Sequence, residues 1–361
     1  MLGYLLILGV AFFFGANSYK VGQNSQYKKF YIILVFGSAL AFAVLRGYDV
    51  ATDYMNRVVQ MKLIFPMSFE EVVRYATRYQ KGEYIYIFYL WTVSRVVESP
   101  WLLNSLMDVF IISTFAWFFH RYSKDVTITS LFFMAFTFSS ILNITRQHIA
   151  VAVGLIALHL TWDKQPFKAL ILLLISSLIH ASSILILGFW GFNFWWKRMT
   201  RKHVVLCLIG AFVFFTTFEL CLEKFFLFFP QYQYATSGWA AEQKEFSFLW
   251  LALYSVLFGA IFILMPKQGL QDTSKFVVVS FIIYAVLGLL SSKMVFVARM
   301  QPYFSWGFAM IIPEILSWWH TDERIKAPLA LYFKVGLASW AVLMFQQNGH
   351  NILPYTFIWD Y

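Results

Sequence analysis

Long apolar segments separated by short polar or basic stretches recur along the whole chain. The segments lack the alternation typical of half-buried strands, and most are long enough for a helix to cross a hydrocarbon layer about 30 Å thick. Backbone groups in lipid must be hydrogen-bonded internally, which an α-helix achieves. The pattern predicts helices at Leu2–Tyr19, Phe30–Leu45, Trp101–Phe119, Val126–Ile144, Ile149–Trp162, Ala169–Ile179, Ser182–Trp196, Val204–Phe218, Phe246–Leu264, Phe276–Ser292, Pro302–Trp319 and Ala327–Phe345.

These segments predict an all-α polytopic membrane protein, with residues 1–361 forming a single transmembrane domain. We expect about ten to twelve transmembrane helices, because a membrane bundle uses roughly 25–30 residues per helix and loop. The two segments that flank His180 are too short for two full crossings, so they predict a short hairpin. Residues 83–97 end at a Glu-Ser-Pro sequence, and we expect them to form a short helix in the outer leaflet.

The first large loop, residues 46–82, has apolar residues at helical spacing. Tyr54, Val58 and Met61 would share one face of a helix, and a similar pattern follows in the second half of the loop. We therefore expect two amphipathic helices lying on the outer membrane surface. A second outer loop is predicted at residues 219–245.

The composition narrows the class of protein. Hydrophobic residues make up 60% of the chain and charged residues 13%, against about 45–50% and about 25% in soluble domains. This balance excludes a soluble enzyme, a disordered chain and a disulfide-stapled secreted domain. The net charge of +10 does not indicate nucleic-acid binding, because the basic residues lie in short loops and not on one solvated face. The lipid bilayer is the expected partner.

The basic residues also predict the orientation. More than half of the 28 Lys and Arg residues fall beside span ends on one side of the membrane, if the N-terminus is outside. Basic loops are typically cytoplasmic. The clusters lie at residues 20–29, 121–124, 164–168, 197–202, 267–275 and 324–326.

This topology places most of the costly polar residues on the outer side. Ionisable residues at membrane depth are functional candidates, because burying them is expensive. The candidates are Arg46, Asp49, Asp53, Glu83, Arg146, Gln147, His180 and Arg299. A structural role stays open for each: an interfacial anchor or helix end for an arginine, a helix-dipole partner or solvated edge for a carboxylate, and a satisfied hydrogen bond for the histidine.

Arginines, carboxylates and a histidine that face one outer cavity suit a particular reaction. Arginine binds phosphates bidentately and neutralises charge on a phosphate leaving group. A carboxylate or histidine can accept the proton of a sugar hydroxyl. The pattern therefore indicates transfer of a sugar from a lipid phosphate or pyrophosphate, and we expect this chemistry to need no metal or other cofactor.

Five short motifs resemble, in order, those of the EpsG-type, Wzy-like polysaccharide polymerases of bacteria. They are Leu45-Arg46-Gly47-Tyr48-Asp49 through Asp53-Tyr54, Glu83-Tyr84, Asn143-Ile144-Thr145-Arg146-Gln147-His148-Ile149-Ala150, Ile179-His180-Ala181-Ser182, and Arg299 followed by Tyr303-Phe304. The chain departs from the family at Arg57, where Tyr is frequent, and at Tyr84, where Pro is frequent.

The resemblance implies a metal-independent polymerase in the bacterial cytoplasmic membrane. It would join, at the outer face, oligosaccharide repeat units carried on undecaprenyl pyrophosphate. Donor and acceptor lipids would be its partners, with chain-length regulator and flippase proteins as further ones. The expected catalytic residues are Asp53, Glu83, Arg146 and His180, with Asp53 or His180 as the general base. The expected substrate-binding residues are Arg46, Tyr54, Asn143, Gln147, Arg299 and Tyr303.

Other functions stay open at this point. A glycosyltransferase that uses a polyprenyl-phosphate sugar would share the loop and the arginines but add one sugar only. A lipid-linked oligosaccharide transporter would need charged residues along a path through the spans, where Asp108, Glu314 and Lys334 lie. A non-enzymatic assembly subunit is a third alternative.

Overall fold

The computed structural model describes residues 2–16, 25–79, 83–195, 198–228, 245–270, 272–319, 323–348 and 350–360. Contacts divide the chain into two compact units, and the single transmembrane domain stays a prediction. The first unit comprises Met1–Gly191 and Thr321–Tyr361, and the second comprises Phe192–His320. Each unit is described by itself.

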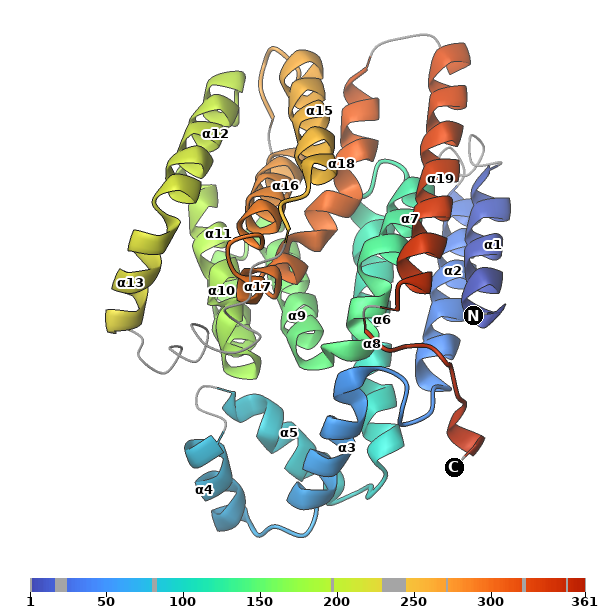
Figure 1. The fold of residues 1–361 in the computed structure, drawn as a ribbon, viewed down its shortest axis with the longest axis vertical. Helices are drawn as coiled ribbons and strands as arrows, with labels where there is room; N and C mark the ends of the chain where they lie inside the picture. Colours follow the sequence, from blue (N-terminus) through green and yellow to red (C-terminus); the bar gives the residue numbers. More distant parts are fainter. Residues whose placement is uncertain are drawn as a thin grey trace. The chain divides into compact units, whose positions relative to one another are not determined.

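The first unit contains the elements that carry most of the predicted site (Figure 1). They are α1 (Leu2–Ala16), α2 (Ser25–Val44), α3 (Thr52–Ile64), α4 (Phe69–Tyr79), α5 (Tyr84–Ser94), α6 (Pro100–Tyr122), α7 (Val126–Phe136), α8 (Phe138–Asn143), α9 (Thr145–Trp162), α10 (Pro166–Ile179), η1 (Ala181–Ser183), most of α11 (Ile184–Trp195), α19 (Glu323–Gln346) and η4 (Ile358–Asp360).

The second unit is also helical in the part that the structure describes. Its elements are α12 (Arg201–Thr216), α13 (Phe218–Phe228), α15 (Phe248–Leu264), α16 (Asp272–Leu290), α17 (Val295–Ala298), η3 (Gln301–Phe304) and α18 (Ser305–Trp318). Gly307 of α18 lies so close to α16 that an added Cβ would meet the side chain of Ser280 at 2.4 Å.

Within the described residues, each predicted apolar segment coincides with a helix, and the all-α polytopic membrane class is confirmed. By length and composition, four described helices can cross a membrane: Ser25–Val44, Pro100–Tyr122, Thr273–Leu290 and Ile325–Gln346. A pair bent by 71°, Arg201–Thr216 with Phe218–Lys224, would be a fifth. The remaining apolar helices are shorter, so the count of ten to twelve crossings stays a prediction.

Two predicted segments are interrupted. The segment Val126–Ile144 breaks at Thr137 into α7 and α8. The segment Val204–Phe218 breaks at Thr217, whose hydroxyl donates to the Val213 carbonyl at 2.8 Å, a contact that bends helices. The predicted outer loop at 219–245 therefore begins as helix α13, and its residues 229–244 lie outside the described residues.

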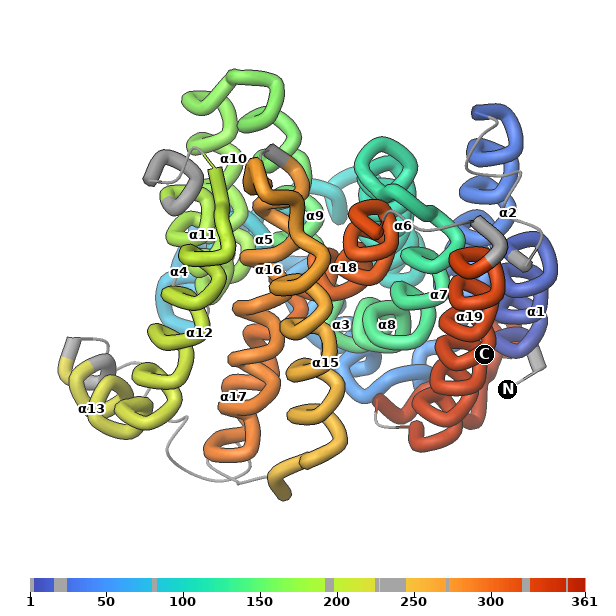
Figure 2. Tube along the Cα trace, turned by 90° about the horizontal axis from the view of Figure 1, so that it is seen from above, coloured from blue at the N-terminus to red at the C-terminus, as the bar shows by residue number. Residues whose placement is uncertain are grey.

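The helices α1, α2, α7 and α19 lie side by side in one part of the first unit (Figure 2), and aromatic side chains pack where α2, α6 and α7 meet. The ring of Phe133 lies 4.9 Å from that of Phe36 and 5.2 Å from that of Phe115. All three side chains are buried. Tilted ring pairs at this spacing add to the stabilisation from burial.

The two ends of the first unit differ in charge. At one end, which we call the basic end, Lys28 lies near Lys124 and Asp125, and Arg121 lies 3.9 Å from Asp163. At the opposite end, which we call the loop end, the Trp101 indole donates to the Val44 carbonyl at 2.7 Å. This hydrogen bond joins the last residue of α2 to the start of α6.

At the loop end, α3, α4 and α5 pack together beneath the bundle (Figure 1). Their shared core contains Met61 and Ile64 from α3, Val72 from α4 and Ile87 from α5, all fully buried. Tyr54, Val58 and Met61 are buried residues of α3, and the predicted position of this helix on the membrane surface stays a prediction. This small core gives the start of α5 a fixed position on the bundle.

Candidate active site

Three predicted catalytic residues come together at the loop end. Glu83 immediately precedes α5, Arg146 lies in the first turn of α9, and His180 is the extended residue between α10 and η1. Arg146 Nη1 lies 2.8 Å from Glu83 Oε2, and His180 Nδ1 bonds to Glu83 Oε1. One carboxylate thus holds both a guanidinium and an imidazole.

The electrostatics fix the proton positions in this cluster, which we call the Glu83 cluster. Burial alone would raise the pKa of the Glu83 carboxyl. The hydrogen bond and charge of His180, the charge of Arg146 and the backbone N–H of Ala181 outweigh burial and hold that pKa below its ordinary value. Glu83 is therefore an anion at neutral pH, and because a carboxylate only accepts, His180 Nδ1 is the donor in this contact and Nε2 is the ring nitrogen that points away from Glu83.

The Glu83 cluster is open enough to meet a ligand. The side chains of Arg146, His180 and Glu83 are 33%, 26% and 14% exposed. Among the described residues, nothing hydrogen-bonds to His180 Nε2. The Arg146 guanidinium also lies over the Tyr86 ring at 5.1 Å, a contact that fixes its plane.

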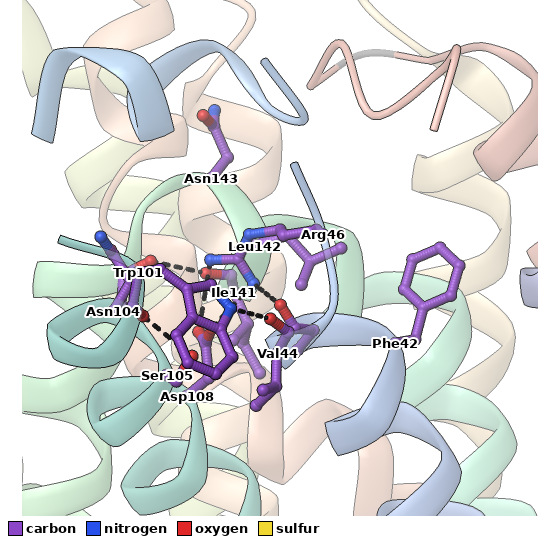
Figure 3. Close-up of polar contacts among 12 residues, drawn as sticks. Phe42, Val44, Arg46, Trp101, Asn104, Ser105, Asp108, Ile141, Leu142 and Asn143 are labelled. Carbon is purple, nitrogen blue, oxygen red and sulfur yellow. Dashed lines mark hydrogen bonds and ion pairs between the residues drawn. The ribbon is translucent and has the colours of Figure 1, made fainter. Parts of the chain in front are cut away.

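Arg46 forms a second arginine–carboxylate pair that is closed. Its Nη1 lies 2.8 Å from Asp108 Oδ2 on α6, and the two side chains are 0% and 1% exposed (Figure 3). The same nitrogen donates to the Ala43 carbonyl at 2.7 Å. Because both charges are enclosed and paired with each other, the contacts favour a structural role for Arg46, although its Nε has no hydrogen-bond partner among the described residues; the predicted substrate contact of Arg46 stays a prediction.

Arg57 is a buried residue of the site that the sequence analysis did not select. It donates to Asn104 Oδ1 at 3.1 Å, to the Leu142 carbonyl at 3.3 Å and to the Asn143 carbonyl. Burial, with the nearby Arg46 charge, lowers the pKa of Arg57 to about 10, so Arg57 stays charged at neutral pH. The sequence feature that could have identified Arg57 is its spacing, because positions 54, 57, 58 and 61 lie on one face of a helix.

Asn143 connects the first loop to the end of α8. Its Oδ1 accepts the backbone N–H of Asp53 at 2.7 Å, and its Nδ2 lies 3.2 Å from His350 Nδ1. The carboxylate of Asp53 is partly exposed and makes no hydrogen bond with the residues that the structure describes. His350 is a second residue that the sequence analysis missed.

The other predicted residues differ in exposure. Tyr54 and Gln147 are buried, and Tyr54 lies beneath the Arg46 guanidinium at 4.6 Å. Arg299 is exposed and Tyr303 is buried. Both belong to the second unit, so a shared site with the Glu83 cluster stays a prediction.

The ionisable residues within spans have local partners. Asp108 pairs with Arg46. Lys334 donates to the Gly15 carbonyl at the end of α1, at 3.0 Å. Glu314 accepts from the Ser274 hydroxyl, also at 3.0 Å. These contacts give each of the three residues a local partner within the first or the second unit.

The fold and the Glu83 cluster together define a multi-pass membrane protein with an arginine–carboxylate–histidine site at one end of a helical unit. The family model described as the EpsG family matches residues 29–357, and the chain belongs to that family. Membership supports a polysaccharide polymerase type of membrane glycosyltransferase. No curated protein and no solved structure matches the chain.

Proposed function

We propose that this protein polymerises oligosaccharide repeat units carried on undecaprenyl pyrophosphate, at the outer face of the bacterial cytoplasmic membrane. The observation that carries the proposal is the Glu83 cluster, in which one carboxylate orients a guanidinium and an imidazole that are both partly exposed. The cluster lies at the end of the first unit opposite the basic end, and basic ends are typically cytoplasmic.

In the proposed reaction, a hydroxyl of the incoming unit attacks the anomeric carbon of the growing chain. A new glycosidic C–O bond forms as the bond between that carbon and the pyrophosphate oxygen breaks. Undecaprenyl pyrophosphate leaves with the electron pair, and the hydroxyl proton passes to His180 Nε2. Glu83 stabilises the imidazolium that forms, as a buried carboxylate does for a catalytic histidine.

The charge that develops on the pyrophosphate needs a cation. Arg146 supplies a planar donor group suited to phosphate oxygens, and Arg299 and Tyr303 stay predicted substrate-binding residues of the second unit. Asn143 and Gln147 orient the acceptor sugar. Asp53 is the alternative general base, because its partly exposed carboxylate has no hydrogen-bond partner among the described residues.

The test is incubation of the purified protein with a lipid-linked repeat unit, followed by separation of products by size. We expect a ladder of products from the native chain and a loss of about 100-fold or more in rate for His180→Ala, the usual effect of removing a general base. A product longer by one sugar from a polyprenyl-phosphate sugar donor would favour the single-addition enzyme. A normal ladder from both Arg146→Ala and His180→Ala would refute the assigned roles.

A further inference from the structure

The segment that follows α19 lies along the first loop. The Gly47 N–H donates to the Thr356 carbonyl at 2.8 Å, and the Ile358 N–H donates to the Leu45 carbonyl at 3.0 Å. Nearer to α3, the Thr52 N–H donates to the His350 carbonyl at 3.2 Å. Residues 350–358 thus border the loop that leads into α3 and Asp53.

The contacts of Asn143 determine which way its amide is turned. The Oδ1 atom accepts the Asp53 N–H, so the Nδ2 atom faces His350 Nδ1. An amide nitrogen donates only, and the ring nitrogen opposite it must therefore accept. His350 Nδ1 is accordingly the acceptor in this contact.

We propose that His350 is a positioning residue for glycosyl transfer. Its Nδ1 holds the Asn143 amide, and the amide holds the first turn of α3, which carries Asp53. Without an acceptor at that place the amide is free to turn over, and its NH2 group then faces the Asp53 N–H, so that two donors oppose each other. The backbone carbonyl of Asn143 is held separately by Arg57. Loss of His350 Nδ1 therefore affects the side-chain amide of Asn143 and the first turn of α3 that this amide holds. The inference rests on the proposed function in the form in which Asp53 is the general base.

Three substitutions at one position separate this role from others. In His350→Asn, the side-chain oxygen occupies nearly the place of Nδ1 and still accepts a hydrogen bond. In His350→Gln, the amide reaches the place of Nε2 instead. In His350→Ala, no polar group occupies the place of Nδ1 or that of Nε2. Tyr355→Phe is the matched control, because Tyr355 lies in the same segment and its hydroxyl contacts only the Phe42 carbonyl among the described residues.

The measurement is kcat and KM for the lipid-linked repeat unit with each purified full-length variant, together with its thermal midpoint in detergent. We expect His350→Ala and His350→Gln to lower kcat by about 10- to 100-fold, a typical result of misplacing a reacting group, with KM changed by less than about twofold. His350→Asn and Tyr355→Phe should keep kcat within about threefold of the native chain.

Three outcomes overturn the proposal. Full activity in His350→Ala overturns it, and so does an active His350→Gln beside an inactive His350→Asn, which would indicate direct use of Nε2. If His350→Ala does not fold, the matched Asn and Gln variants still give the decision. A double variant with Asn143→Ala should be no slower than Asn143→Ala alone, and an additive loss overturns the proposal. Failure of the native chain to make a ladder refutes the proposed function itself, which is a different result.

Discussion

Two arginine–carboxylate pairs lie at the loop end of the first unit with the same separation but different burial. Arg46–Asp108 and Arg146–Glu83 both have a nitrogen–oxygen distance of 2.8 Å, yet the first pair is 0% and 1% exposed and the second 33% and 14%. An enclosed charge depends on its partner, because water cannot replace it. A partly exposed guanidinium can bind a phosphate as well as a carboxylate. The two pairs therefore differ in burial and not in contact distance. Burial suits Arg46–Asp108 to a structural role, and partial exposure suits Arg146–Glu83 to contact with a substrate.

Removing one member of the enclosed pair should have the largest effect. We expect Arg46→Ala to lower the free energy of unfolding by about 3–5 kcal/mol, since Asp108 would be left as an unpaired buried charge. The double variant Arg46→Met with Asp108→Leu should be less destabilised than the single one. Denaturant unfolding in detergent micelles measures both. A single variant as stable as the native chain would contradict the structural role of Arg46.

Breaking the partly exposed pair, Arg146–Glu83, should lower the polymerisation rate much more than it lowers the free energy of unfolding. We expect Arg146→Ala to slow polymerisation by about 100-fold, equal to about 2.7 kcal/mol of transition-state stabilisation. Its free energy of unfolding should fall by less than about 1 kcal/mol, because solvent screens a pair of this exposure. Arg146→Lys keeps the charge but loses the planar guanidinium, so its polymerisation rate should lie between those of the native chain and Arg146→Ala. If Arg146→Ala is strongly destabilised while its folded molecules polymerise at the native rate, then Arg146 has the structural role and the comparison between the two pairs is reversed.

The smallest effect is a change in the acid dependence of stability. The pKa of Glu83 is lower in the folded chain than its ordinary value, so the folded state binds the proton less well than the unfolded state. The resulting stabilisation is complete above the ordinary glutamate pKa and is lost as the pH falls through the lowered value.

Glu83→Gln should flatten this acid-side slope while leaving the slope above the ordinary glutamate pKa unchanged. Thermal midpoints of both proteins across the acid range give the comparison. An equally steep acid slope in Glu83→Gln would show that another group is responsible.

The sequence predicted the helices well, because a long apolar run in lipid has few alternatives to a helix. It also selected all three members of the Glu83 cluster, since charged residues within apolar sequence stand out. It did not reveal which charges pair, because Arg46 and Asp108 are 62 residues apart and pairing depends on how α6 packs. Arg57 was missed although it shares the inward face of α3 with Tyr54. His350 lies in a polar stretch after the last predicted span, where nothing marks one residue above its neighbours.

The separations within the Glu83 cluster have a consequence for biogenesis. Glu83 precedes Arg146 by 63 residues and His180 by 97. A chain that enters the bilayer as it leaves the ribosome, N-terminal part first, therefore acquires its anion, then its cation, and its imidazole last. A nascent chain halted before α10 would already have Glu83 and Arg146 but not His180, so the Glu83 cluster is complete only after α10 has left the ribosome.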